Sequence, residues 1–144
     1  MDGKAECDFC EKTVLKKQLL YKDKLASIIY PQRPIIFNHL MIIPNRHIEK
    51  FEDLTNEEII KMSQLVKKAF SIFKCQQKAC GFNLFTNDGD KAGQKIPHAH
   101  WHVFFRFDQE PISPYQILSN PKLKEKISAK EWKQRRDRIK GWFQ

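Results

Sequence analysis

Three of the five histidines in the chain stand at alternate positions, His98, His100 and His102, within the stretch IPHAHWHVFFR at residues 96–106. A β-strand places alternate side chains on one face, so the three imidazoles are expected to project together. A neutral imidazole can attack phosphorus and form a covalent intermediate. A neighbouring imidazole can hold negative charge and donate a proton near neutral pH. The row is therefore predicted to perform phosphate chemistry, with chance placement or an all-histidine metal site as the alternatives.

A second group that could do chemistry is the pair Cys7 and Cys10, whose separation is that of zinc ligands. A redox pair or chance would give the same spacing. No strand–helix–strand pattern surrounds the pair, which argues against the redox interpretation. A structural zinc site needs four ligands, and the chain also contains His47 and His98 as candidates.

Four segments are predicted to form the strands that position these residues. Residues 25–30 and 35–43 are short apolar runs separated by two prolines, which favour a turn or loop between two strands. Residues 81–87 form a third strand and residues 96–107 the last one. The intervening residues 87–93 contain two glycines and have the composition of a turn.

A helix is predicted from about residue 56 to residue 74. Thr55 and Glu58 have the spacing of a capping box, and apolar residues recur beyond them at helical intervals. The order strand, strand, helix, strand, strand indicates an α+β domain in which a helix covers an antiparallel sheet.

Beyond residue 110 the sequence changes to short, basic helical segments. Ser113 and Asn120 each precede a proline, and Ser128 opens a capping-box pattern, so all three are predicted N-caps. The apolar side of the last helix is thin. We expect this helix to pack on the domain through three aromatic anchors, Trp132, Trp142 and Phe143.

The formal charge of +9 indicates either a solvated surface or a phosphate-rich partner. Residues 122–140 contain nine Lys or Arg against three Asp or Glu, so the C-terminal part accounts for most of the excess. Nucleic acid is one partner that such a segment would attract, and nucleotides are another.

The length of 144 residues fits a single domain. No apolar run approaches the roughly 20 residues that a membrane-spanning helix needs, so no membrane partner is expected. The N-terminal stretch MDGKAECDFC is polar and lacks the apolar centre of a secretory signal. A cytoplasmic location is therefore expected, where cysteines are thiols or metal ligands rather than disulfides.

The histidine row and its surroundings resemble the histidine triad (HIT) family. Gly93 and Gln94 followed by His-x-His-x-His are similar to the family signature. The stretch NDG at 87–89 resembles the family's asparagine-glycine turn, and residues 39–47 resemble its His-φ-φ-φ-φ-Pro-x-x-His segment. The likeness covers most of the chain.

This resemblance implies a HIT-like fold, in which an antiparallel sheet of about five strands packs with a long helix. Residues 1–110 would form the nucleotide-binding catalytic domain, and residues 111–144 a basic helical extension packed on it. The resemblance also implies a homodimer, with the helix at 56–74 close to the partner.

The resemblance assigns roles to individual residues. His100 would attack the α-phosphorus of a nucleotide ester, amide or anhydride, and His102 would contact the phosphate oxygens. Gln94 would lie near the bridging oxygen or a phosphate oxygen, and Asn87 would bind phosphate or ribose. His39 resembles the family histidine near the nucleoside pocket and would support the triad.

Two binding regions follow from the same resemblance. Phe9, Ile29 and Ile43 are candidates for the apolar wall of the nucleoside pocket, and ordinary core is an equally good interpretation of each. One branch of the family holds a structural zinc ion, for which the ligands here would be Cys7, Cys10, His47 and His98.

The sequence departs from the family pattern at two places. Lys95 stands where the family usually has Ser or Thr. A cation there could hold an anionic leaving group such as a polyphosphate tail, or it could simply point to solvent. Residues 28–33 contain no acid where many members have a ribose-binding aspartate. The base and the leaving group are therefore not predicted.

Three functions are compatible with this pattern. The first is hydrolysis of nucleotide phosphoramidates or (di)nucleoside polyphosphates through a nucleotidyl-histidine intermediate. The second is nucleotidyl transfer of the galactose-1-phosphate uridylyltransferase type, although those relatives typically have glutamine where this chain has His102. The third is a zinc-stabilised module that binds nucleotides or RNA with little turnover.

Overall fold

The structure, a computed structural model, describes residues 7–144. Residues 1–6, which contributed to the expectation of no secretory signal, lie outside the described residues. Five strands form one antiparallel sheet in the order β1-β2-β3-β5-β4. They are β1 (Leu19–Lys22), β2 (Ala26–Ile29), β3 (His39–Pro44), β4 (Gly81–Thr86) and β5 (Trp101–Arg106). The predicted α+β fold with about five strands is confirmed.

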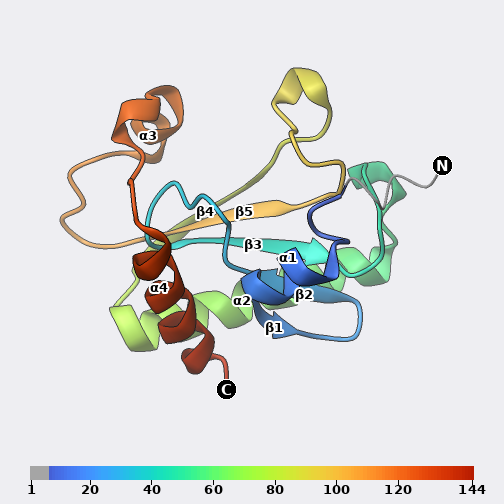
Figure 1. Ribbon diagram of the computed structural model, residues 1–144, viewed down its shortest axis with the longest axis horizontal. Coiled ribbons are helices and arrows are strands. Elements are labelled where there is room, and N and C mark those ends of the chain that lie inside the picture. The colour runs from blue at the N-terminus through green and yellow to red at the C-terminus, as the bar shows by residue number, and fades with distance from the viewer. Residues whose placement is uncertain (1–6) are drawn as a thin grey trace.

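Four α-helices within residues 7–144 accompany the sheet. Figure 1 shows α3 and α4 on the same side of the molecule. The helices are α1 (Lys12–Gln18), α2 (Asn56–Gln77), α3 (Pro114–Ser119) and α4 (Ala129–Trp142). Short 3-10 turns occur at η2 (Phe51–Asp53), η3 (Asp90–Ala92) and η4 (Pro121–Leu123). Within residues 7–144, no helix has the length and apolar character needed to cross a membrane.

Helix α2 begins with the predicted capping box. The Thr55 hydroxyl accepts the N–H of Glu58 at 3.1 Å, and the Glu58 carboxylate accepts the N–H of Thr55 at 2.9 Å. These bonds satisfy donors that the first helical turn leaves unpaired. The helix continues to Gln77, beyond the predicted end near residue 74, and ends at Lys78 in the left-handed region with φ 58°.

The two faces of the sheet pack against different partners. One face packs with α2 in the main core, whose strand residues include Ile28, Leu40, Ile42, Val103 and Phe105. The opposite face has a smaller apolar cluster made of Cys7, Phe9, Ile29, Met41 and Ile43. Because side chains alternate along a strand, His39 shares this second face with Met41, and His102 pairs with Met41 across the β3–β5 ladder. The second face of the sheet therefore carries the imidazole rings of His39 and His102.

The predicted start of the last strand, at residue 96, is wrong. Strand β5 begins at Trp101, so only His102 of the three histidines lies in a strand. Pro97 lacks an N–H for a ladder bond, and the N–H of Ala99 donates to the Ile48 carbonyl at 2.6 Å. His98 and His100 therefore lie in a loop rather than along one ladder row.

Helix α1 and strand β1 were not predicted. Glu11 caps α1 by accepting the N–H of Thr13 at 3.1 Å, a residue type that is uncommon at this position. The helix has seven residues, too few for a clear helical period. Strand β1 has four residues at the edge of the sheet, and its pairing with β2 is irregular between Leu19 and Tyr21.

Helix α4 packs against the domain at the β1 end of the sheet. Ser113, Asn120 and Ser128 cap α3, η4 and α4 as predicted. The Trp132 indole N–H donates to the Pro31 carbonyl at 2.7 Å. Ile139 and Phe143 are buried in the main core, and Trp132 and Trp142 pack against it. The division of the chain at residue 110 stays a prediction.

Replacing Met62, which has no exposed surface on α2, with alanine should lower the free energy of unfolding by about 2–5 kcal/mol. The loss reflects the apolar contacts removed and the cavity left behind. Ile60→Ala is the matched control, because Ile60 lies on the same helix with 56% of its surface exposed, and should change stability by at most about 0.5 kcal/mol. Urea denaturation measures both values, and equal losses would contradict the assigned helix face.

Candidate active site and metal centre

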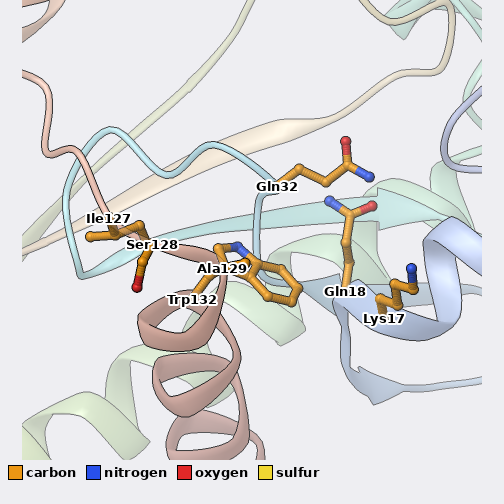
Figure 2. Close-up of a pocket in the computed structure, with 7 residues that line it drawn as sticks. All are labelled: Lys17, Gln18, Gln32, Ile127, Ser128, Ala129 and Trp132. Atoms are coloured by element: carbon orange, nitrogen blue, oxygen red, sulfur yellow. The ribbon is translucent and has the colours of Figure 1, made fainter.

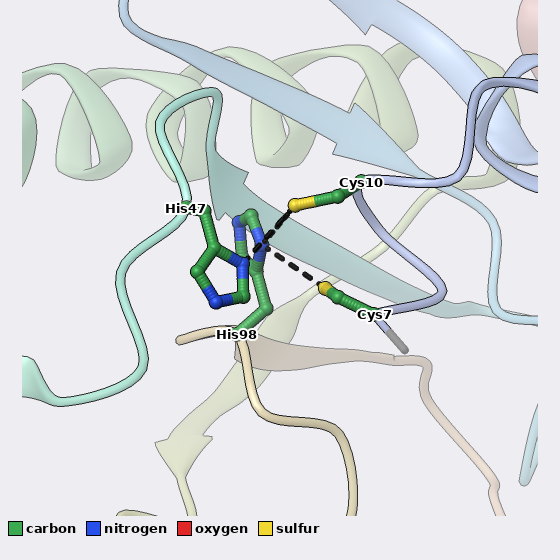
Figure 3. A group of neighbouring side chains, drawn as sticks. All are labelled: Cys7, Cys10, His47 and His98. Carbon is green, nitrogen blue, oxygen red and sulfur yellow. Dashed lines mark hydrogen bonds between the residues drawn. The ribbon is translucent and has the colours of Figure 1, made fainter. Parts of the chain in front are cut away.

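Four side chains that can bind a metal meet at one point. Cys7 and Cys10 lie in the N-terminal segment, His47 follows β3, and His98 precedes β5. Figure 3 shows the four side chains pointing toward one another. One ligand atom from each lies within 4.8 Å of the others. The Cys10 sulfur is 3.1 Å from His47 Nδ1 and 3.6 Å from His98 Nδ1. The Cys7 sulfur is 3.5 Å from His98 Nδ1.

This donor set fits a tetrahedral metal ion. Ordinary zinc–sulfur and zinc–nitrogen bond lengths place neighbouring S and N ligands about 3.6 Å apart, close to the separations found here. His98 Nε2 lies 2.8 Å from the Pro44 carbonyl, which can only accept, so Nε2 bears the hydrogen and Nδ1 presents its lone pair to the sulfurs. Burial lowers the pKa of His98 to about 4, which keeps the ring neutral near pH 7.

A cleft of about 550 Å³ opens on the second face of the sheet, a volume in the range of about 300–1,000 Å³ typical of ligand pockets. Among its lining are six residues that the sequence singled out: Phe9, His39, Asn87, Lys95, His100 and His102. The structure thus brings together residues from the N-terminal segment, β3, the 87–95 loop and β5.

His100 presents an unprotonated nitrogen. Its Nδ1 lies 2.7 Å from the His98 carbonyl, so Nδ1 donates a hydrogen and Nε2 retains a lone pair. Burial lowers the pKa of His100 below its usual value, although the bond to the carbonyl opposes this effect. Phe9 packs edge-on against both neighbouring imidazoles, with ring centroids 5.5 Å apart for His100 and 5.6 Å apart for His98. The ring is therefore held as a neutral, oriented base or nucleophile.

A chain of hydrogen bonds sets the opposite state at His102. The backbone N–H of Ile35 donates to His39 Nδ1 at 3.1 Å, so the hydrogen of neutral His39 is on Nε2. That Nε2 lies 2.9 Å from His102 Nδ1 and donates to it. The hydrogen of neutral His102 is then on its own Nε2. His102 is thus a hydrogen-bond donor, whereas His100 is an acceptor.

The low pKa values of both rings support the neutral states used in this assignment. Burial is the main cause of the lowered pKa of His39, with further contributions from His102, His100 and Lys124. Burial also lowers the pKa of His102 to about 3, with the charge of His100 adding to the effect. Phe85 stacks on the His102 ring at 4.8 Å and fixes its plane.

The remaining predicted residues lie close to the cleft in different ways. Gln94 accepts the N–H of Gly89 at 2.8 Å and donates to the Glu49 and Ile96 carbonyls at 3.1 Å each. Its amide is engaged in joining loops, and contact with phosphate stays a prediction. Ile29 and Ile43 are at most 1% exposed and pack in the small apolar cluster with Phe9.

Several residues at the cleft were missed by the sequence analysis. Arg33 comes from the loop between β2 and β3, and Leu118 and Lys124 come from the C-terminal segment. Among residues 7–144, the lining has three cationic side chains, Arg33, Lys95 and Lys124, and one acidic residue, Asp8. Lys124 has no local signal that separates it from the other basic residues at 122–140, so only the fold reveals its place.

A second, smaller cavity of about 250 Å³ shares Gln18 and Gln32 with the cleft. Figure 2 shows that its walls come from the end of α1, the loop after β2 and the beginning of α4. Trp132 faces Gln18 across this cavity. The C-terminal segment therefore borders both hollows on this side of the molecule.

The geometry supports displacement chemistry at phosphorus. The rings of His100 and His102 lie 4.9 Å apart between centroids, one with a free lone pair and one with an N–H. A nitrogen that can act as a nucleophile and an N–H that can donate to phosphate oxygens thereby lie at the same cleft, which cationic side chains also line.

The sequence matches the family model described as HIT domain over residues 12–109, more than half of the chain. The chain is 30% identical to a bis(5'-nucleosyl)-tetraphosphatase (asymmetrical) from Schizosaccharomyces pombe, over 68% of this chain and 54% of that protein. It is 31% identical to a bis(5'-adenosyl)-triphosphatase from Saccharomyces cerevisiae, over 69% of this chain and 48% of that one. The chain thus spans about half the length of these curated relatives.

Solved structures share the fold. A Zn-bound histidine triad family protein from Mycobacterium smegmatis superposes with a TM-score of 0.73 at 22% identity, covering 98% of this chain and 97% of that one. A diadenosine triphosphate hydrolase from Plasmodium falciparum superposes with a TM-score of 0.69 at 20% identity, covering 89% and 77%.

Purified protein is expected to contain one tightly bound metal ion per chain, because two thiolates and two imidazoles form a closed ligand set. Cys10→Ser should lose this metal. Cys75→Ser should retain it, since Cys75 is exposed and lies outside the cluster. Elemental analysis after dialysis checks both variants, and a metal-free wild-type protein from metal-replete cells would refute the site.

Proposed function

The chain belongs to the HIT family, and from that premise we propose that it is a hydrolase of (di)nucleoside polyphosphates or nucleotide phosphoramidates that acts at the α-phosphate. The observation that supports this most strongly is the opposite protonation of two neighbouring rings, with a lone pair on His100 Nε2 and a hydrogen on His102 Nε2. The first can attack phosphorus, and the second can hold the charge that develops on its oxygens.

We propose a reaction in two steps. In the first, His100 Nε2 forms a bond to the α-phosphorus while the bond to the leaving group breaks, and the leaving group departs with the electron pair and takes a proton from solvent. In the second, water attacks the same phosphorus and gives up a proton to solvent, the nitrogen–phosphorus bond breaks with its electron pair returning to Nε2, and a nucleoside monophosphate is released. His102 donates its N–H to a non-bridging oxygen in both transition states.

Polyphosphates are the substrates that the charge of the cleft favours. Arg33, Lys95 and Lys124 line it and would attract a chain of several negative charges. The names of the yeast relatives, a tetraphosphatase and a triphosphatase, point to the same class. Lys95 stands where the family usually has Ser or Thr, and its positive charge would hold an anionic leaving group.

Nucleotidyl transfer to a second substrate is the less favoured activity. Transfer requires that water be kept from the nucleotidyl-histidine until the acceptor arrives. The third position of the row is histidine here, and its N–H is directed by His39 through the bond of 2.9 Å. This supports hydrolysis, in line with the hydrolase names of the relatives.

We propose that zinc is the metal of the four-residue site. A soft sulfur pair with two imidazoles is the donor set that zinc prefers, and a closed set of four serves structure rather than catalysis. When bound, zinc would tie the N-terminal segment to the loops at His47 and His98. His98 would thereby hold its carbonyl, and so His100, in place.

A homodimer in the cytoplasm is the proposed state of the protein. Strand β4 is an edge of the sheet, and its Phe82 and Leu84 side chains are 38% and 44% exposed. Exposed apolar residues on an edge strand favour pairing with a second copy. A reducing compartment would keep Cys7 and Cys10 as metal ligands.

His100→Ala should lower kcat for diadenosine tetraphosphate hydrolysis by at least about 10³-fold, because the covalent nucleophile is removed. His102→Ala should lower it by about 10²–10³-fold, the usual cost of losing one transition-state donor. Steady-state release of nucleoside monophosphate measures both. Thermal unfolding of each variant is the control for folding.

Cys80→Ser, at an exposed position outside the cleft, should keep wild-type rates. If wild-type protein hydrolyses neither diadenosine polyphosphates nor adenosine phosphoramidate, the proposed function fails. If His100→Ala remains fully active, the function stands and the assigned nucleophile is wrong.

A further inference from the structure

Glu125 binds the C-terminal segment (residues 111–144) to the loop that precedes β3. The backbone N–H of Glu125 donates to the Ile35 carbonyl at 3.2 Å. The Glu125 carboxylate accepts the N–H of Phe37 at 3.1 Å with one oxygen. Its other oxygen accepts a hydrogen bond of 2.7 Å from the guanidinium of Arg135 in α4. One residue thus joins helix α4, the segment at 124–125 and the loop at 35–37.

Further contacts hold the same loop in one position. The Arg135 guanidinium lies over the Phe37 ring at 5.1 Å. The Tyr30 hydroxyl donates to the Phe37 carbonyl at 3.2 Å. The same loop, residues 35–37, also supplies the Ile35 N–H that orients His39 and, through it, His102. The C-terminal segment is therefore connected to the His39 and His102 rings through this loop.

This anchoring places Lys124 at the cleft. Lys124 directly precedes Glu125, and it lines the cleft together with Leu118 of α3. Its positive charge reaches the buried His39 ring and contributes, after burial and the neighbouring histidines, to lowering the pKa of that ring. Among the described residues, no acidic group forms an ion pair with Lys124. Its ammonium group is available to a ligand.

Lys124 differs in this respect from its basic neighbours. Lys122 and Lys126 are exposed on the same segment but are not part of the cleft lining. The apolar part of the lining, with Phe9, Met41 and Ile96, provides a wall for a nucleoside and no charge for a phosphate chain. The anionic part of a substrate would find its cations elsewhere around the cleft.

We propose that the C-terminal segment builds a subsite for the phosphate chain beyond the α-phosphate, with Lys124 as the cation that binds it. The inference rests on the proposed function and deepens it, because it names the segment and the residue that would favour nucleotides whose leaving group is itself a polyphosphate. Lys124 lies outside residues 12–109, the part of the chain that the family model matches. The subsite is accordingly a property of this chain's own C-terminal segment.

The test compares Lys124→Gln with Lys122→Gln and Lys126→Gln in the full chain on two substrates. Diadenosine tetraphosphate has a polyphosphate leaving group, whereas adenosine phosphoramidate releases only ammonia. Lys124→Gln should raise KM for the tetraphosphate by roughly three- to tenfold, as expected for one exposed cation–phosphate contact, and leave the phosphoramidate unchanged. Raising the salt concentration should shrink the difference. The two control variants should match the wild type on both substrates.

Glu125→Ala gives a second, independent variant, because it releases the anchor without removing the cation. Because the Glu125 carboxylate also holds the loop whose Ile35 N–H orients His39, this variant should lower kcat on both substrates and in addition raise KM for the tetraphosphate alone. Thermal unfolding checks that the fold persists. Equal effects of Lys124→Gln and Lys122→Gln would overturn the subsite, and so would an equal loss on both substrates by Lys124→Gln. Wild-type protein that cleaves the phosphoramidate alone would also overturn it. Inactivity of the wild type on both substrates would instead refute the proposed function.

Discussion

The site depends on backbone groups that fix one nitrogen of each imidazole and thereby decide what the other can do. Carbonyls of Pro44 and His98 accept from His98 and His100, and the N–H of Ile35 donates to His39. Because a neutral ring has one donor and one acceptor, each bond determines the tautomer. Three similar side chains are thereby suited to the proposed roles of metal ligand, nucleophile and hydrogen-bond donor.

The fold provides these backbone groups at the correct places. The antiparallel pairing of β3 with β5 puts His39 diagonally across from His102, close enough for the bond of 2.9 Å. The loop at 97–100 leaves the sheet, so the rings of His98 and His100 need not share one ladder row. Phe9 packs against both rings and connects the cysteine pair with the cleft. The four candidate metal ligands and the cleft are thus adjacent and share the contacts of Phe9 and the His98 carbonyl.

Much of this arrangement could be predicted from local patterns. The capping box of Thr55 and the periodic apolar face of α2 are short-range signals, and the spacing of Cys7 and Cys10 suggested their role. The beginning of β5 was wrong, because the bond from Ala99 to Ile48 joins residues far apart in sequence. The same limit applies to Gln94, which is engaged by backbone groups of three loop positions, and to Lys124, which only the Glu125 anchor brings to the cleft.

The tautomers of the imidazole rings test most directly the assignment of His100 as nucleophile and His102 as hydrogen-bond donor. Long-range ¹H–¹⁵N correlation spectra of the ¹⁵N-histidine-labelled protein near pH 7 distinguish protonated from unprotonated ring nitrogens. His100 should be neutral with its hydrogen on Nδ1, and His39 and His102 should be neutral with theirs on Nε2. A hydrogen on His100 Nε2, or on His102 Nδ1, would contradict the assignment of the nucleophile and the donor.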